Sequence, residues 1–554
     1  MPTRFLFLRQ PRSPRTVVVW LALWLAAVGN LALWRELWRI GGGTPAFFVG
    51  LGIAVFVFTA TVALMSLTAW GRWCKPIWIA ILVAAGVAQH FMLSYGVVMD
   101  TTMLANTVHT DPHEVRDLIG WVFIGNLLLV VALPALLVIV VPIMRTPWWP
   151  QLRKNAALFL GAVAATVVSM FAMYGPVAPL VRNHMQLRYI VNPIAGLSSA
   201  VRIAVGPLLR KSDELVPIAA GVTLGPSYLT ADKPPLLVVV VGETARADHF
   251  GLNGYARDTT PELAALGVLS FRDVHSCGTD TRDSVPCMFS PLGKTDFEKR
   301  KAEHENLLDL LQAAGLAVLW LDNQAGCKEV CARVPTASTA DLTGESAAQL
   351  CHDGECFDDA MLVGLDERLA RLPEERRKRG IVLVMHQMGS HGPAYFKRSP
   401  PVLKRFMPEC TNTTLGQCDP AQLVNAYDNT IATTDHFLAA TIAWLKGRGD
   451  LATGLLYMSD HGESLGEIGI FGRIFLHGLP YRIAPEVQKR VPFVAWLGDA
   501  LAARRGLNAT CLRGRLDAPL SHDNLYHIVL GLLDVATPTY AVGLDAFAPC
   551  RSKP

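Results

Sequence analysis

Charged side chains are scarce in this sequence, and neither sign dominates. Of its 554 residues only 17% are charged, and the formal net charge is +4. Nucleic-acid binding usually requires a clear basic excess, so the composition argues against nucleic acid as a partner. The sequence also has no internal repeat, no low-complexity tract and no sustained run of charge. With 51% hydrophobic residues, the chain is apolar for a soluble protein and too long for one ordinary domain.

Cysteine is nearly absent from the first half of the chain, where Cys74 stands alone. The others fall into close pairs: Cys277, Cys287, Cys327, Cys331, Cys351, Cys356, Cys410, Cys418, Cys511 and Cys550. An even number in close pairs indicates five disulfides in an oxidising compartment, most simply between nearest neighbours. The alternative is a zinc cluster, because Cys327 and Cys331 have the spacing of metal ligands. We favour the disulfides.

The apolar residues concentrate before about residue 175, in five runs long enough to cross a membrane. These runs cover residues 16–34, 46–70, 76–98, 119–144 and 155–174. The first lacks a convincing cleavage site for a signal peptidase, so we expect it to be retained. Basic residues lie before the first run, between the second and third, and between the fourth and fifth. Because such residues favour the cytoplasmic side, we expect a cytoplasmic N-terminus and everything after residue 175 outside.

We therefore divide the chain into three parts. Residues 1–174 form a five-helix transmembrane domain, residues 175–234 a bridging amphipathic segment and linker, and residues 235–554 an outer domain. The outward loop at about 99–118 is unusually polar, and its Asn106, Thr110 and Glu114 are spaced by four, which puts them on one face of a helix. This loop is either a solvated interfacial helix or a polar patch that receives a lipid head group.

The pattern after residue 235 predicts an α/β domain. Four apolar runs, at residues 236–241, 316–321, 381–385 and 455–458, alternate with helical patterns, which predicts a mainly parallel sheet. Polar residues follow each run: Glu243, Asp322, His386 with His391, and Asp460 with His461 and Glu463. Because parallel strands present their carboxyl ends at one edge, these residues suggest a metal site with oxygen and nitrogen ligands. His477 lies further along the last connection, as a residue supporting the ligands, a ligand of a second metal or a surface residue.

The loop from Cys277 to Cys287 suggests a nucleophile. It holds three hydroxyl residues, Thr279, Thr281 and Ser284, just before the residues that begin a predicted helix. A cysteine-stapled loop with a hydroxyl at a helix N-terminus can hold an anion near a nucleophile. The residues alone do not select one hydroxyl.

Six segments of this sequence together resemble the phosphoethanolamine transferases, which include the lipid A-modifying and mobile colistin-resistance enzymes. The segments are Gly242-Glu-Thr-Ala-Arg246, Cys277-Gly-Thr-Asp-Thr281, Ser284-Val-Pro-Cys-Met-Phe-Ser290, His386-Gln-Met-Gly-Ser-His-Gly-Pro393, Ser459-Asp-His-Gly-Glu-Ser-Leu-Gly466 and Leu476-His-Gly478. The resemblance covers essentially the whole chain. It implies an alkaline phosphatase/sulfatase-like fold for the outer domain.

The resemblance also assigns roles to residues. It implies one tightly bound zinc ion held by Glu243, Thr281, Asp460 and His461, with Thr281 as the nucleophile. It places His391 and His477 beside that zinc, in contact with substrate or a second metal, and gives them acid–base roles. It assigns Asn106, Thr110 and Glu114 to phosphoethanolamine binding. It puts Lys328 near the substrate and Glu463 behind the site.

The implied reaction moves phosphoethanolamine from phosphatidylethanolamine to a phosphate of lipid A through a covalent phosphothreonine. This change lowers the negative charge of the surface and gives resistance to polymyxin and cationic peptides. We expect a monomer in the bacterial inner membrane, in contact with its lipids, with a periplasmic catalytic domain. The alternatives are transfer to a core-oligosaccharide acceptor, a membrane-anchored sulfatase or phosphodiesterase, or a non-catalytic sensor.

Two features depart from the family pattern. Arg282 and Asp283 follow the expected nucleophile where the family has small or apolar residues. Their charges could tune the choice of acceptor or simply pair with each other. The segment from Gly466 to His477 is also longer than usual and carries Ile468 where asparagine is familiar.

Overall fold

The computed structural model describes residues 10–41, 44–109, 115–116, 118–209, 215–469 and 472–552. Contacts group the chain into two units. The first contains Met1–His109, Leu118–Leu208 and Gly466–Phe475, and the second contains Thr110–Asp117, Leu209–Leu465 and Leu476–Pro554.

The first unit is built from apolar helices. Among the described residues, four helices are long and apolar enough to cross a membrane, at Val49–Ser66, Lys75–Ser94, Trp121–Val140 and Trp148–Ala172. They correspond to α4 (Thr44–Ser66), α5 (Lys75–Ser94), α8 to α9 (Trp121–Leu127 and Leu133–Val140, joined by the short π-helix Leu128–Ala132) and α10 (Trp148–Ala172). The predicted helical membrane domain is therefore confirmed. The shorter helices are α6 (Thr101–His109), α11 (Tyr174–Asn183) and α12 (Ile194–Leu209).

The first predicted span differs from the expectation of one helix over 16–34. The chain forms α2 (Pro14–Ala27) and α3 (Leu31–Gly41), bent by 43°, so five spans result only if this pair counts as one. The buried Asn30 lies at the break, and its Nδ2 donates to Leu25 O (2.8 Å) and Asn192 O (2.6 Å). Asn192 in turn donates from Nδ2 to Gly29 O (2.9 Å). These side chains satisfy backbone carbonyls that a continuous helix would occupy, which explains the bend.

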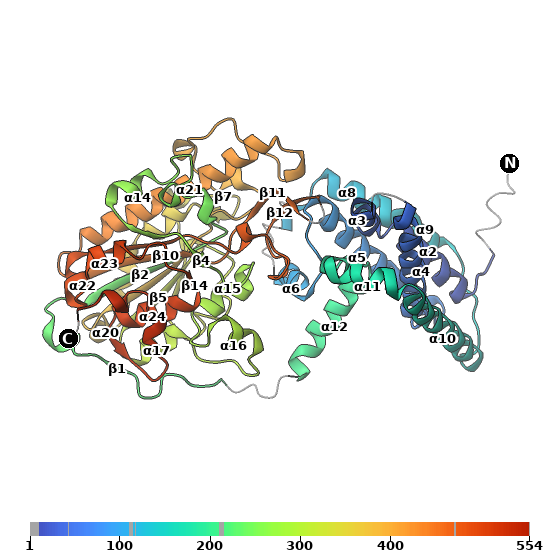
Figure 1. Cartoon of the computed structure of the whole chain (residues 1–554), viewed down its shortest axis with the longest axis horizontal. Coiled ribbons are helices and arrows are strands. Elements are labelled where there is room, and N and C mark those ends of the chain that lie inside the picture. Colours follow the sequence, from blue (N-terminus) through green and yellow to red (C-terminus); the bar gives the residue numbers. More distant parts are fainter. Residues whose placement is uncertain are drawn as a thin grey trace. The chain divides into compact units, whose positions relative to one another are not determined.

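The second unit contains a seven-stranded mixed sheet, drawn in Figure 1, in the order β3-β13-β10-β2-β9-β5-β6. The strands are β3 (Leu269–Phe271), β13 (Phe493–Leu497), β10 (Ala452–Ser459), β2 (Pro235–Gly242), β9 (Ile381–His386), β5 (Ala317–Asp322) and β6 (Thr336–Ser338). The run from β10 to β6 is parallel, and β13 is antiparallel to both of its neighbours. The predicted mainly parallel α/β domain is confirmed, including its four central strands.

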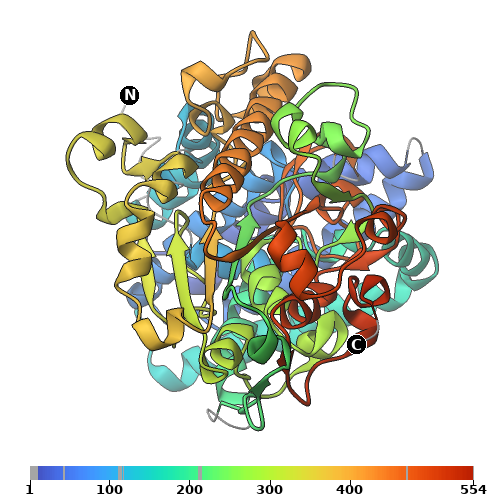
Figure 2. The ribbon, with the colours of Figure 1, turned by 90° about the vertical axis from the view of Figure 1, so that its left-hand side faces the viewer.

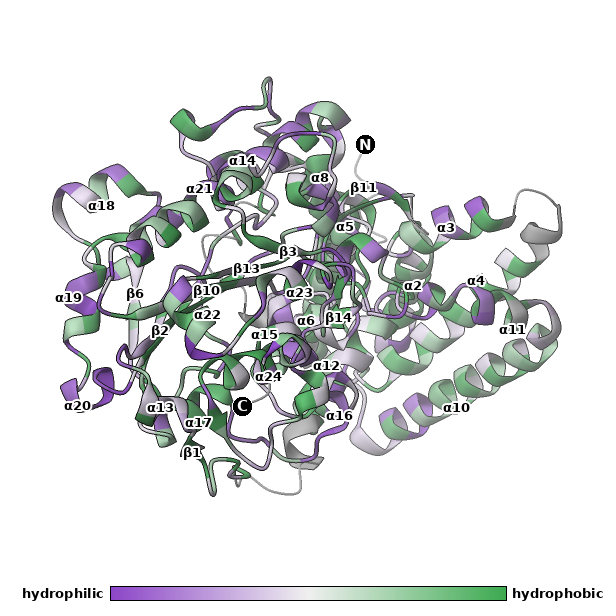
Figure 3. Ribbon diagram, turned by 60° about the vertical axis from the view of Figure 1, so that its left-hand side comes forward, coloured by the Kyte–Doolittle hydropathy of each residue, from purple (hydrophilic) through white to green (hydrophobic). Residues whose placement is uncertain are grey.

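Helices cover both faces of this sheet. Alternate residues of the wholly buried β2 pack in one core with α15 (Thr281–Met288), α17 (Leu307–Ala313) and α24 (Asp523–Leu532). The long α21 (Pro420–Lys446, orange) runs along the opposite side in Figures 1 and 2. The residues of β2 are hydrophobic, and Figure 3 draws hydrophobic residues in green. This packing holds the central strands, and hence the residues that follow them, in fixed positions.

A hairpin carries the longer segment noted in the sequence. It consists of β11 (Ser464–Gly469) and β12 (Gly472–Leu476), and Glu463 and His477 lie at its two ends. Its outer part, Gly466–Phe475, belongs to the first unit by contacts, and the Phe475 N–H donates to Tyr95 O at 2.9 Å. Ile468 on this hairpin is 89% exposed.

Replacing Asp428 with alanine is expected to lower the free energy of unfolding by at least about 2 kcal/mol. This fully buried carboxylate of α21 lies 2.6 Å from His249 Nδ1, and it accepts hydrogen bonds from Tyr255 Oη (3.0 Å) and Arg257 Nη1 (2.8 Å). Its loss removes the acceptor of His249 Nδ1 and Tyr255 Oη, whereas Arg257 Nη1 keeps its hydrogen bond to Asn425 Oδ1 (2.8 Å). Thermal unfolding of the full chain in detergent checks this. Asp517→Ala, which removes an exposed carboxylate paired with Arg272, serves as the control and is expected to have a smaller effect.

Candidate active site

Three ligand-type side chains meet at the carboxyl edge of the central sheet. Glu243 follows β2, and Asp460 and His461 follow β10, whose Ser459 lies beside Gly242 in the parallel register. One ligand atom from each of the three residues lies within 4.8 Å of the others, and all three residues are buried. The sheet register therefore brings together residues more than 200 positions apart in the chain.

Thr281 reaches this cluster from a different element. It is the first residue of α15, after the N-cap Asp280, whose side chain accepts from Asp283 N at 3.1 Å. Thr281 Oγ1 donates to Glu243 Oε2 at 3.1 Å and lies 3.4 Å from His461 Nε2. The structure therefore unites the four residues that the resemblance proposed as metal ligands.

The hydrogen bonds of the cluster favour a bound cation. His461 Nδ1 lies 2.9 Å from Gly462 O, which assigns its proton to Nδ1 and leaves a lone pair on Nε2. That nitrogen lies 3.5 Å from Glu243 Oε1 and 3.3 Å from Asp460 Oδ2. Burial, the main cause, also holds the pKa of His461 well below its usual value. Lone pairs that face one another in a buried site repel unless a cation lies between them, and this nitrogen and oxygen donor set suits zinc.

Two further histidines lie beside His461. The ring centroid of His477 is 4.4 Å from that of His461 and 5.7 Å from that of His391. Burial lowers the pKa of His391 well below its usual value, with a contribution from His477. Burial also disfavours protonation of His477, but the Glu463 carboxylate, 3.4 Å from Nδ1, outweighs it and raises the pKa. The surroundings therefore shift the pKa values of these two histidines in opposite directions.

The loop after β5 places two residues near the cluster, of which the sequence predicted only Lys328. Gln324, which the sequence analysis did not select, donates from Nε2 to Glu243 Oε2 at 3.1 Å. Its position just beyond a strand end was the available signal. Lys328 lies in the short loop closed by Cys327 and Cys331, with φ of +49°, and its charge contributes to the low pKa of His391. Both residues therefore lie close to the cluster.

Other residues from the sequence analysis fall elsewhere. Asp322 and His386 follow neighbouring strands as expected, but they pair with each other, with Oδ1 and Nδ1 3.0 Å apart, and are not part of the buried ligand cluster. Asn106 lies on α6 of the first unit. Thr110 and Glu114 lie outside the described residues.

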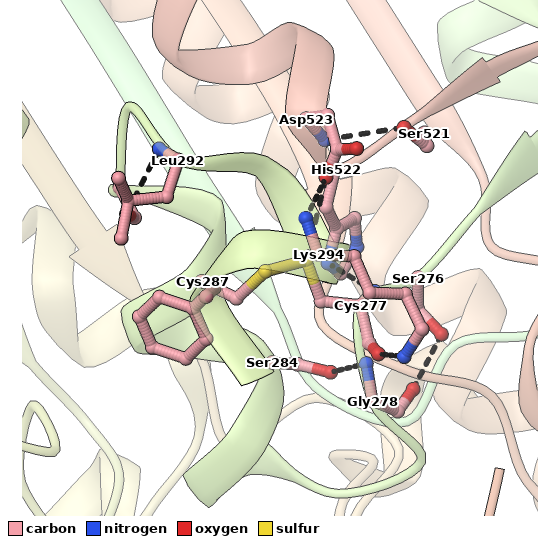
Figure 4. The surroundings of a disulfide bond; sticks show 12 residues. Ser276, Cys277, Gly278, Ser284, Cys287, Leu292, Lys294, Ser521, His522 and Asp523 are labelled. Atoms are coloured by element: carbon pink, nitrogen blue, oxygen red, sulfur yellow. Dashed lines mark hydrogen bonds between the residues drawn. A yellow bond between two sulfur atoms is a disulfide. The ribbon is translucent and has the colours of Figure 1, made fainter. Parts of the chain in front are cut away.

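The ten later cysteines form five disulfides between sequence neighbours, and the alternative zinc cluster is wrong. They pair as Cys277–Cys287, Cys327–Cys331, Cys351–Cys356, Cys410–Cys418 and Cys511–Cys550. The first closes the loop that carries Thr281 (Figure 4).

His522 fastens that loop to the sheet. The Cys277 N–H donates to His522 Nδ1 at 3.0 Å (Figure 4). On its other side, His522 Nε2 lies 2.9 Å from Ser459 O, one residue before Asp460. Because Nδ1 accepts, Nε2 must carry the proton and donate. The neutral histidine therefore links the nucleophile loop to the strand end that carries Asp460 and His461.

We expect the stability of the chain to fall as the pH drops below about 6.5, in part through His522. Burial lowers the pKa of His522 to about 3, so the unfolded chain binds the proton more readily and acid favours unfolding. His522→Gln keeps an acceptor and a donor but does not titrate, so it should show a shallower loss of melting temperature between pH 7.5 and 5. His275→Gln, at a histidine whose side chain is 40% exposed, is the control. Identical pH slopes for wild type and His522→Gln would contradict this assignment.

Comparisons with known proteins agree with the site. The Sulfatase family model matches residues 235–535, and the model described as Phosphoethanolamine transferase EptA/EptB matches residues 57–207. Phosphoethanolamine transferase EptA of Salmonella typhimurium is 36% identical over 564 residues, covering 98% of both chains. Phosphatidylethanolamine transferase Mcr-1 of Escherichia coli is also 36% identical, covering 95% of this chain and 96% of that one. A more distant relative, Kdo(2)-lipid A phosphoethanolamine 7''-transferase of Escherichia coli, is 27% identical, covering 94% and 93%.

A solved structure matches along nearly the whole length. The integral membrane protein lipooligosaccharide phosphoethanolamine transferase A from Neisseria meningitidis has a TM-score of 0.90 and 32% identity, with coverage of 97% of this chain and 99% of that chain. Family models, full-length relatives and this structure all agree. The protein is thus an integral membrane enzyme with a periplasmic catalytic domain. It belongs to the EptA/Mcr family of phosphoethanolamine transferases, within the sulfatase superfamily.

Proposed function

We propose that this enzyme transfers phosphoethanolamine from phosphatidylethanolamine to a phosphate of lipid A through a covalent phosphothreonine at Thr281. The observation that carries the proposal is the Thr281 hydroxyl, 3.1 Å from Glu243 and 3.4 Å from His461 in a buried cluster at the start of α15. One zinc ion held by Glu243, Thr281, Asp460 and His461 would lower the pKa of the hydroxyl and offset charge on the phosphoryl oxygens. A second zinc ion beside His391 and His477 is compatible with the proposal.

Different groups of the protein carry out the separate steps of the first half of the reaction. The Thr281 oxygen attacks the phosphorus of the donor, and the bond to the diacylglycerol oxygen breaks. His477, whose pKa Glu463 raises against the effect of burial, is suited to protonate that leaving oxygen. The backbone N–H groups at the start of α15 favour the negative charge of the phosphoryl group. Lys328, near His391, adds positive charge on the same side.

We assign donor recognition to Asn106, Thr110 and Glu114, as the family resemblance implies. We also place the enzyme in the bacterial inner membrane and propose that it is a monomer. The basic residues that flank the apolar segments support a cytoplasmic N-terminus. Addition of an ethanolamine amine lowers the net negative charge of lipid A. Polymyxin and other cationic peptides then bind more weakly, which gives resistance.

Two alternatives keep part of this chemistry. Transfer to a sugar of the core oligosaccharide is supported by the likeness to the Kdo(2)-lipid A phosphoethanolamine 7''-transferase. A sulfatase or phosphodiesterase activity, with water as acceptor, is supported by the Sulfatase family match.

Mass spectrometry of lipopolysaccharide from cells with and without this chain separates the three reactions. The proposal expects one added phosphoethanolamine group per modified phosphate in the isolated lipid A fraction. An added group found only on the core sugars would assign the sugar as acceptor. Free phosphoethanolamine without any modified glycolipid would assign a hydrolase.

A further inference from the structure

The residue that follows Thr281 presents a positive charge beside the reaction centre. Successive residues of an α-helix are turned by about 100°, so Arg282 points to a different side of α15 from Thr281. Arg282 and Asp283 are both exposed, whereas Thr281 is half-buried. The two charges therefore lie at the surface where α15 begins, next to the nucleophile.

Arg282 differs from the neighbouring cations because, in the part of the chain that the structure describes, no carboxylate pairs with it. Among the described residues, no carboxylate lies within 4.0 Å of its guanidinium, so it does not pair with Asp283. The other cations that act on Asp283 are Lys294 and Arg300. Lys294 Nζ pairs with Glu298 at 2.7 Å, and Arg300 Nε pairs with Glu303 at 3.1 Å.

An unpaired guanidinium beside a phosphoryl-transfer nucleophile is suited to bind an anion. Its planar donors match two oxygens of a phosphate at once, which an uncharged sugar hydroxyl cannot offer. Because Arg282 lies to one side of the Thr281 hydroxyl, it suits the second substrate, which binds after the donor has reacted with Thr281. We propose that Arg282 recognises the phosphate monoester of the acceptor glycolipid, and so selects phosphate acceptors over sugar hydroxyls; this inference rests on the proposed function.

The step that Arg282 serves is the second half of the reaction. An oxygen of the acceptor phosphate attacks the phosphorus of the phosphoethanolamine on Thr281, and a phosphorus–oxygen bond forms. The bond from phosphorus to Thr281 Oγ breaks, and its electron pair stays on the threonine oxygen, which takes a proton from water through His477. The product is a diphosphate ester that carries ethanolamine. Arg282 offsets the acceptor charge, which otherwise repels the phosphoryl group.

The two halves of the transfer reaction can be measured separately with the purified full chain in detergent. Fluorescent phosphatidylethanolamine is the donor, and diacylglycerol released in the absence of acceptor reports the first half. Lipid A, and the same lipid after enzymatic removal of its phosphates, are the acceptors. The variants are Arg282→Ala, Arg282→Lys and, as a control that removes another exposed cation, Lys301→Ala.

Arg282→Ala is expected to raise the acceptor KM about 10- to 100-fold, the loss typical of a hydrogen-bonded charge contact. Arg282→Lys should recover part of this loss, Lys301→Ala should match wild type, and the first burst of diacylglycerol should be the same in all four proteins. The inference is overturned if Arg282→Ala changes the acceptor KM no more than Lys301→Ala. It is also overturned if wild type modifies the dephosphorylated lipid equally well. If wild type releases no diacylglycerol, the proposed function itself fails.

Discussion

Replacing Thr281 with alanine is expected to lower the rate of phosphoethanolamine transfer by at least about 10³-fold, because removal of a covalent nucleophile leaves only binding and electrostatic effects. Thr281 Oγ1 is the hydroxyl that contacts both Glu243 (3.1 Å) and His461 (3.4 Å). The other two hydroxyls of the loop make hydrogen bonds to the backbone, since Thr279 donates to Leu479 O and Ser284 accepts from Gly278 N. Transfer from labelled phosphatidylethanolamine to lipid A measures the rate.

Two further variants make this result specific. Thr281→Ser keeps a hydroxyl at the same position and should retain part of the activity. Thr295→Ala removes an exposed threonine of the neighbouring helix α16 (Gly293–Lys299) and should leave the rate unchanged. Undiminished transfer by Thr281→Ala, with a normal melting temperature, would reject Thr281 as the nucleophile.

Removal of the metal is expected to have the second largest effect. A cation that stabilises several kcal/mol of transition-state charge accounts for about 10²- to 10³-fold in rate, so chelation should lower transfer by that factor. The melting temperature should also fall, because two buried carboxylates are left facing the lone pair of His461 Nε2. Added zinc should restore both quantities. Mass spectrometry of the metal in the purified protein gives the number of ions per chain.

Variants at one sheet edge provide the control for metal binding. Glu243→Gln and His461→Ala alter the buried cluster and should lose the metal. Asp322→Asn alters a carboxylate of the same edge that pairs with His386 instead, and should keep it. Equal metal content in Glu243→Gln and wild type would contradict the assigned ligands.

The sequence predicted the central sheet and the cluster at its edge because both depend on local patterns. Four buried strands were visible as apolar runs, and parallel strands place their ends together whatever their order. Glu243, Asp460 and His461 follow such strands directly. The edge strands β3 and β6 and the antiparallel strand β13 were not predicted, because they are short or pair in ways that no local pattern specifies.

Other parts of the site depend on contacts between distant segments. His522 lies 245 residues from Cys277, and Gln324 lies 81 residues from Glu243, so no spacing links them. The pairing of Asp322 with His386 depends on the register between β5 and β9, which the sequence did not give. The bend between α2 and α3 likewise depends on Asn192, 162 residues after Asn30.

The most direct test of the mechanism is to detect the intermediate on Thr281. The purified full chain is incubated with phosphatidylethanolamine in the absence of acceptor, and the peptide that contains Thr281 is analysed by mass spectrometry. The proposed function predicts a phosphoethanolamine group on Thr281 that disappears when lipid A is added, with one such group then found on lipid A. Transfer to lipid A without any modified Thr281 peptide, or a modified residue elsewhere in the chain, would contradict it.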